Sequence, residues 1–317
     1  QTQRANGSWM NRGGYGVYPV AMTSLAGIAL MAGGSTPESG PYAKEVTKAM
    51  HYLLNVAEAH GDGLIAGPGG ESRSMHGHGF ALLFLAQCYG TELDRDTEKR
   101  LKAALDKGVK LTARSQSDTG AQYQHAGGWI YAPTSNGDEG SVTVTQLQAL
   151  RACRNAGIAV PKSTIDRAVL YLKYCQQSDG GICYRFNQGR PSGSRPPISA
   201  AAIACFYAAG VYDRKAGGTG PEAAMVGKLV AYCKQHAMPV TKMRGHMYYG
   251  MYYLSQALYQ RGGKDWDTFY PTIRAFLRGK QNGDGSWQGD SVGTTYGTAI
   301  ATTILQLPYG YLPIYQR

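Results

Sequence analysis

The chain has 317 residues, of which 43% are hydrophobic, and a formal net charge of +11 from 32 basic and 21 acidic residues. This composition excludes a disordered or fibrous chain and predicts a folded protein with a sizeable core. The positive charge favours an anionic partner, such as a diphosphate, an acidic polymer or a lipid surface. Because the basic residues recur along amphipathic segments and form no single run, we expect no nucleic acid partner.

The apolar run over residues 17–31 contains Thr23, Ser24 and Gly27 and is too short to span a bilayer, so we expect a buried helix there and no transmembrane segment. The six cysteines form no CxxC pair and fall mostly in apolar runs, which favours buried free thiols. Cys175 and Cys183 flank a turn, and the sequence leaves open whether they pair. It also leaves the compartment open.

Two kinds of helix alternate along the chain. The first kind is amphipathic, with apolar residues at three- and four-residue spacings between charged ones. The second kind is rich in Ala, Gly, Thr, Leu and Tyr and nearly free of charge, as in helices buried on all sides. The amphipathic segments are 42–59, 95–113, 163–177, 221–236 and 267–280, and the charge-poor ones are 18–33, 78–90, 141–156, 197–210, 246–261 and 292–306.

The charge-poor segments begin at intervals of about 50 to 60 residues, which indicates five helical hairpins and a sixth inner helix. An open row of hairpins would expose the terminal charge-poor helices, whereas a ring buries all of them. We therefore predict an all-α fold, an α/α toroid that forms one domain over residues 1–317. The count lacks one outer helix, which would either precede Gln1 or leave a gap in the ring.

Five loops share a pattern of Gly with Asp or Asn, followed by an aromatic or aliphatic residue. We expect the Gly to adopt positive φ, the Asp or Asn to bond its own backbone, and the apolar residue to pack between neighbouring helices. The loops are NGSW at 6–9, GDGLI at 61–65, GGWIY at 127–131, DGGICY at 179–184 and GDGSW at 283–287.

The segment AFLRGKQNGDGSW resembles the Gln-to-Trp repeats of the squalene cyclase and protein prenyltransferase superfamily, through Phe276, Leu277, Gln281, Gly285 and Trp287. YLKYCQQSDGGICY and HAGGWIY are weaker copies. The resemblance implies an α/α toroid with a central cavity, as in terpenoid cyclases. It does not by itself fix the chemistry.

Parallel inner helices would place their N-termini, with positive dipole ends, on one rim of the ring. We expect the functional site there. The candidate substrate-binding residues are Tyr15, Tyr18, His76, His78, His125, Arg195, Arg244, His246, Tyr249, Asp290 and Tyr296.

The acidic segment NGDEGS lies at the predicted start of an inner helix. With the preceding Gly-Gly-Trp it resembles the acid motif of class II terpenoid cyclases, which implies Asp138 as the catalytic acid and Glu139 as its partner. The motif departs from the family because its first Asp is Asn136 and its last is Glu139. Asp138 could equally cap the helix.

The histidines suggest a metal only weakly. His76 and His78 are two residues apart, and Cys88 lies about three helical turns beyond His78, too far to share one ion with it. We assign no metal and no cofactor, and we assign the histidines and Arg244 to substrate contact.

Three functions fit these observations. The first is an isoprenoid-binding or isoprenoid-cyclising protein, in which the 23 tyrosines help to line a dry bore. The second is a lyase or hydrolase of an acidic polysaccharide, with an open, wet site. The third is a non-catalytic binding or scaffold domain. In each case the C-terminal segment LQLPYGYLPIYQR is expected to pack across one end of the ring.

Overall fold

A computed structural model of the chain describes residues 3–11, 17–67, 71, 73–91, 94–118, 126–186, 192–240, 243 and 245–316. Two sets of helices alternate in it, as predicted. The inner helices are α1 (Pro19–Ala32), α3 (Ser74–Cys88), α5 (Gly140–Asn155), α7 (Pro196–Ala208), α9 (Met247–Arg261) and α11 (Thr294–Gln306). The outer helices are α2 (Ala43–His60), α4 (Arg95–Arg114), α6 (Lys162–Tyr174), α8 (Gly220–His236) and α10 (Gly263–Gly279).

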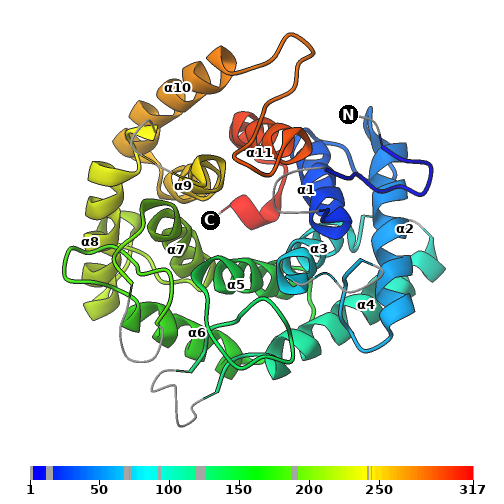
Figure 1. Ribbon diagram of the computed structural model, residues 1–317, viewed down its shortest axis with the longest axis horizontal. Coiled ribbons are helices and arrows are strands. Elements are labelled where there is room, and N and C mark those ends of the chain that lie inside the picture. The colour runs from blue at the N-terminus through cyan, green and yellow to red at the C-terminus, as the bar shows by residue number, and fades with distance from the viewer. Residues whose placement is uncertain are drawn as a thin grey trace.

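The inner helices form a closed ring. Each contacts the next along the chain, and α11 contacts α1 to complete the circle (Figure 1). The outer helices surround this ring, and among the described residues none lies between α10 and α2, where Figure 1 shows a gap. The prediction of a ring with one outer helix fewer than inner helices is therefore confirmed for the described part of the chain.

Small residues allow the inner helices to approach closely. Gly27 of α1 faces the ring of Phe84 on α3, and a Cβ atom at Gly27 would lie 2.4 Å from that ring. Both helices are buried along most of their length, which explains why they carry almost no charge. The outer helices bury only one face, as their amphipathic pattern predicts.

The repeated loops fix the distance between helices. In four of them a Gly with positive φ lies against a backbone carbonyl of the following outer helix, and a Cβ atom there would clash with it. Gly127 has φ 114°, and its Cβ would lie 2.3 Å from the carbonyl oxygen of Arg167. Gly285 occupies the same loop position beside the gap, where the nearest atom would lie 3.9 Å away.

Two residues after each of these Gly, a Trp or Ile donates its backbone N–H to a side chain on the following inner helix. Trp129 donates to Thr143 Oγ1 (3.0 Å), and the Trp129 indole donates to the carbonyl oxygen of Thr112 (2.8 Å). The equivalent pairs are Trp9 with Thr23, Ile65 with His78, Ile182 with Ser199, and Trp287 with Thr298. The predicted packing of these residues between helices is confirmed.

In three of the five repeats a Gln joins the loop to the next outer helix. Gln116 Nε2 donates to the carbonyl oxygens of Gly127 and Thr164, both at 2.9 Å. Gln3 and Gln176 make the same paired bonds in their own repeats. Among the described residues, the side chain of Gln281, beside the gap, bonds only its own loop, at the carbonyl oxygen of Gly285 (3.0 Å).

The C-terminal segment closes one end of the ring. Tyr315 is buried, and its hydroxyl bonds the Tyr252 hydroxyl of α9 at 2.7 Å. Gln260 donates to the carbonyl oxygen of Ile314. Figure 1 shows this segment inside the circle of inner helices.

Six cysteines are buried free thiols, as predicted. Among the described residues, no helix is both long and apolar enough to cross a membrane.

Candidate functional site at the N-terminal rim

A group of partly exposed side chains gathers where α3, α5 and α7 begin. We call this group the rim cluster, and it consists of Arg73, His76, Tyr131, Tyr184, Arg185 and Arg195. Backbone bonds hold its loops together: the N–H of Met75 donates to the carbonyl oxygen of Tyr131, and the N–H of Gly140 donates to that of Tyr184. Three successive repeats therefore contribute to one surface.

Glu139 lies beneath the rim cluster and is 0% exposed. Its carboxylate caps α5 by accepting the N–H groups of Ser141 (3.1 Å) and Val142 (2.8 Å). The Tyr184 hydroxyl bonds the Tyr131 hydroxyl at 2.7 Å and also bonds Glu139. Burial and the Glu139 charge raise the pKa of Tyr184, so its hydroxyl stays protonated near neutral pH.

Three guanidinium groups surround this tyrosine pair. The Cζ atom of Arg73 lies 4.8 Å from the ring centroid of Tyr131, and that of Arg195 lies 4.4 Å from the ring centroid of Tyr184. Arg185 also faces Tyr131, at 5.8 Å, and its buried Nε has no hydrogen-bond partner among the described residues. None of the three forms an ion pair within that part of the chain. The cluster therefore carries a net positive charge, which the single Glu139 carboxylate beneath it offsets only in part.

His76 is the side chain of the rim cluster that can act as a proton acceptor. Burial lowers its pKa, the charges of Arg73 and His246 lower it further, and only Glu139 acts in the opposite direction. The ring is therefore neutral at pH 7 and can accept a proton. Its Nε2 lies 3.4 Å from Ser141 Oγ, which in turn donates to Glu139 at 2.7 Å.

Asp138, the predicted acid, is directed away from the rim cluster. It is 4% exposed, and one carboxylate oxygen accepts the Tyr171 hydroxyl of α6 and the Phe186 N–H, both at 2.6 Å. Asn136 pairs with the backbone of Asp118. In this arrangement Asp138 links the loop before α5 to the outer helix α6.

His78 requires a correction, because it does not lie at the rim. It is fully buried against the outer helix α4, where its Nδ1 accepts the N–H of Ile65 and its Nε2 bonds Thr112 Oγ1 at 3.0 Å. Both ring nitrogens are thus used internally. His78 takes the place that Thr or Ser has in the other repeats, so we remove it from the substrate-binding residues.

The remaining candidates that the structure describes lie on the α1, α9 and α11 side of the rim. His246 and Asp290 both have positive φ, and Asp290 accepts the N–H of Tyr248 (3.2 Å) at the start of α9. Burial raises the pKa of Asp290, and burial with the charge of Asp290 raises that of Tyr296. Tyr18 is half-buried before α1, and Tyr249 lies near Glu139. Tyr15, His125 and Arg244 lie outside the described residues.

One rim carboxylate was missed by the sequence analysis. Glu71 accepts the N–H groups of Gly67 and Val20, the latter at the start of α1. Burial raises its pKa to about 7, although these two bonds oppose the shift. Its buried Oε2 has no partner among the described residues.

Tyr131 and Tyr184 were also missed, although the repeats contain a signal for them. Each lies two residues after the residue that packs between helices, Trp129 or Ile182. Two residues after the buried Trp129 or Ile182, the chain has come back to the rim, so the tyrosine at that position lies there. Arg73 and Arg185 carried no comparable signal.

The middle of the ring is bridged by polar side chains. Gln148 of α5 donates to Oε1 of Gln256 on α9 at 2.8 Å, and both side chains are buried. Since α7 separates α5 from α9, this bond crosses the ring. The described residues contain no group of three or more His, Cys, Asp or Glu side chains able to hold a metal.

Comparisons with known proteins identify the architecture. No protein-family model and no curated protein matches the chain. Among solved structures, the GH76A α-1,6-mannanase of a Salegentibacter species has a TM-score of 0.67 at 10% identity, covering 96% of this chain and 93% of that one. Type II terpene cyclase MstE from Scytonema has a TM-score of 0.57 at 14% identity, covering 98% and 94%.

The fold is an α/α toroid. A GH76 α-mannanase from Bacteroides thetaiotaomicron supports the same conclusion, with a TM-score of 0.54 at 9% identity over 90% of this chain and 83% of that one. At these identities the similarity shows the fold alone. It is compatible with both the isoprenoid and the carbohydrate hypotheses.

Proposed function

We propose that the rim cluster binds an acidic polysaccharide and cleaves it by β-elimination. The observation that carries this proposal is the convergence of Arg73, Arg185 and Arg195, none of them ion-paired within the described residues, on the hydrogen-bonded pair Tyr131 and Tyr184. Guanidinium groups recognise carboxylates in a planar, two-bonded geometry, and tyrosine rings stack on sugars while bonding their hydroxyls.

The site offers the three groups that elimination from a uronate needs. An arginine neutralises the sugar carboxylate, which acidifies the adjacent C5–H. Neutral His76 removes that proton, the C4–O bond breaks as a C4–C5 double bond forms, and the Tyr184 hydroxyl protonates the leaving oxygen. Tyr131 and Glu139 hold Tyr184 in place, and Glu139 stabilises the His76 cation that forms.

Hydrolysis is less well supported, because it needs two accessible carboxyl groups on either side of the scissile bond. Inactive variants of the Salegentibacter mannanase replace two consecutive aspartates, and this chain has the consecutive pair Asp138 and Glu139. Here both carboxylates are buried and engaged by protein groups. The pair therefore supports the rim structurally.

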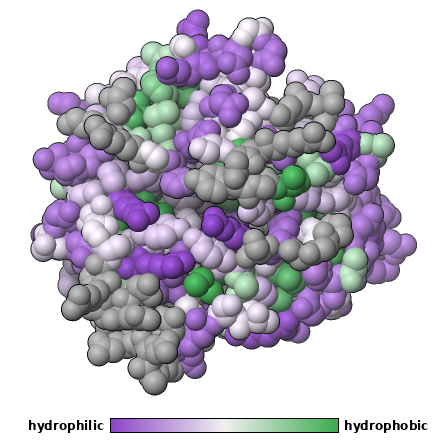
Figure 2. Space-filling model, in the orientation of Figure 1, coloured by the Kyte–Doolittle hydropathy of each residue, from purple (hydrophilic) through white to green (hydrophobic). Residues whose placement is uncertain are grey.

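The isoprenoid hypothesis, with Asp138 as acid, is weakened by three observations. The Gln148–Gln256 bond crosses the bore where a hydrocarbon chain would lie, and Asp138 faces α6. The face seen in Figure 2 is also mostly hydrophilic, apart from the atoms drawn grey. The Gln-to-Trp repeats still support a place in the squalene cyclase superfamily, since their glutamines make the same bonds in successive repeats.

The experiment is incubation of the protein with a panel of uronate polymers at low salt, following both the ultraviolet absorbance of unsaturated uronates and the release of reducing ends. We expect both signals to rise together. Tyr184→Phe should reduce the rate about 100-fold or more, and Arg195→Ala should raise KM. Arg278→Ala, which removes the same charge from the exposed face of α10, should have no effect.

Each alternative has its own outcome. Reducing ends without the absorbance change would show hydrolysis and contradict elimination. Turnover of geranylgeranyl diphosphate, with no effect on any polymer, would support the isoprenoid hypothesis instead. Absence of binding to every polymer would refute the proposal and leave the scaffold hypothesis.

A further inference from the structure

A cavity lies at the end of the toroid opposite the rim cluster, where α1, α3 and α5 end. Its volume is about 270 Å³, and the C-terminal segment around Tyr311 and Leu312 forms one wall. The rim cluster lies at the opposite ends of α3 and α5. The cavity is therefore separate from the proposed catalytic site.

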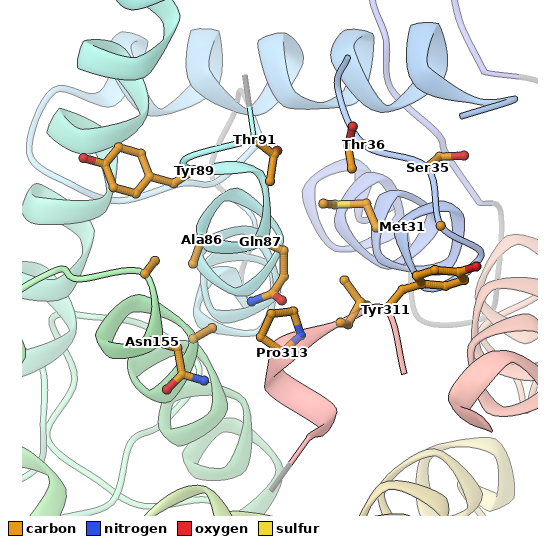
Figure 3. A pocket seen from close by; sticks show the side chains of 14 residues that line it. Met31, Ser35, Thr36, Ala86, Gln87, Tyr89, Thr91, Asn155, Tyr311 and Pro313 are labelled. Carbon is orange, nitrogen blue, oxygen red and sulfur yellow. The ribbon is translucent and has the colours of Figure 1, made fainter. Parts of the chain in front are cut away.

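One buried polar side chain points into this cavity without a partner. Gln87 of α3 is 8% exposed, and its Oε1 accepts no hydrogen bond from the described residues. Figure 3 shows its amide in the middle of the cavity, with Tyr311 on one side and Asn155 on the other. A buried amide oxygen without a donor is costly, so this position favours a ligand that donates a hydrogen bond.

The walls favour an uncharged ligand. Among the described residues, no Lys, Arg, His, Asp or Glu lines the cavity, whereas hydroxyl and amide groups come from Ser35, Thr36, Thr91 and Asn155. The ends of three helices also meet there, and their partial negative charge disfavours anions. This environment is the opposite of the cationic rim cluster.

An aromatic ring provides a stacking surface. Tyr311 is 60% exposed, and its ring packs beside Gly34, where a Cβ atom would lie only 3.1 Å from the ring. The volume is close to the lower limit for small-molecule sites, which suits a single ring. Apolar wall residues such as Met31 and Leu312 suit the C–H face of that ring.

We propose that this cavity binds one neutral sugar residue, stacked on Tyr311 and bonded through a hydroxyl to Gln87 Oε1. It is a binding site independent of the proposed catalysis. Its role would be to hold an uncharged part of a glycan on the face opposite the rim.

The test is titration of the full chain with methyl glucoside, methyl galactoside and methyl mannoside, measured by saturation-transfer NMR and calorimetry. At least one glycoside should bind with a Kd of about 1 mM. Tyr311→Ala and Gln87→Leu should each weaken it at least tenfold. Tyr309→Ala removes another exposed tyrosine, 65% exposed, that does not line the cavity, and should leave binding unchanged.

Three results would overturn the proposal. These are no saturable binding of any glycoside, unchanged binding in Tyr311→Ala, or equal affinity for cyclohexanol, which would show a purely apolar site. Thermal melts of Gln87→Leu separate loss of the site from loss of the fold, and the surface variant Tyr311→Ala tests the site without that risk. Binding that falls in Arg195→Ala would also contradict it by placing the sugar at the rim.

Discussion

The backbone N–H of Ile65 donates to Nδ1 of His78 over 3.2 Å, as Trp129 donates to Thr143 in the next repeat. An imidazole thus fills a position that a hydroxyl fills elsewhere in the ring. Because Nδ1 accepts this bond, the neutral tautomer carries its proton on Nε2, which then donates to Thr112 Oγ1. The contact is available only to the neutral ring.

This contact predicts a pH-dependent stability. Burial lowers the pKa of His78 to about 4, below its ordinary value of 6.5, while nearby Asp62 and Arg114 act in opposite directions. Between these values the unfolded chain binds the proton and the folded chain does not, so the unfolding free energy rises with pH across that window. The difference corresponds to about 3 kcal/mol.

Urea unfolding of wild type and His78→Thr from pH 4 to 7 measures this effect. The Thr variant should lose stability overall because it leaves a cavity, but it should lack the His78 part of the pH slope. An identical slope in both proteins would show that other groups control acid unfolding.

The loop glycines predict unequal costs for the same substitution. Gly127→Ala must adopt φ 114° and place a Cβ against the carbonyl oxygen of Arg167, so we expect a loss of about 2–5 kcal/mol. Gly285→Ala meets no close atom and should cost about 1 kcal/mol, from its positive φ alone. Denaturant midpoints measure both, and equal losses would contradict the role of the neighbouring outer helix.

The repeat glutamines predict a similar contrast. Gln116→Ala leaves the carbonyl oxygens of Gly127 and Thr164 without this donor and removes the Oε1 that accepts from Arg167, so it should cost about 2–4 kcal/mol. Gln281→Ala removes one exposed bond and should cost less than about 1 kcal/mol. Thermal unfolding of the two variants makes the comparison. A larger loss for Gln281→Ala would contradict the role that we assign to Gln116 in joining its loop to α6.

The fold was predictable because the sequence itself shows, by its pattern of apolar and charged residues, which helices are buried on all sides and which on one side only. Charge-poor and amphipathic segments alternate, and the helices follow them closely. The largest errors were at helix starts: α3 begins at Ser74, where we expected 78, and α10 begins at Gly263, where we expected 267. Both begin in Gly- or His-containing segments that look like loops when tertiary contacts are unknown.

The candidate site was less predictable, because periodicity gives a residue's place along a helix but not its partners. Asp138 and Glu139 are adjacent in sequence, yet one bonds an outer helix and the other lies beneath the rim cluster. The importance of Arg73 and Arg185 depends on one tyrosine from another repeat, Tyr131, which both guanidinium groups face. These side chains come together only because the ring places the loops of successive repeats side by side, which the sequence pattern does not show.

For Glu71 we predict a pH dependence of the unfolding free energy opposite in sign to that predicted for His78. Burial raises its pKa to about 7 from an ordinary value of 4.5, so the folded chain binds the proton more tightly than the unfolded chain. The unfolding free energy should therefore fall as the pH rises from about 4.5 to 7, and above that window the buried charge destabilises the fold.

Glu71→Gln removes this charge but keeps a side-chain oxygen at the position that accepts the Gly67 N–H. We expect the variant to be more stable than wild type by about 1–3 kcal/mol at pH 8 and nearly equal to it at pH 4. Parallel urea titrations at the two pH values measure the difference. A variant that is less stable at pH 8 would show that the ionised carboxylate is held by a cation, and the rim would then contain a compensated charge at α1.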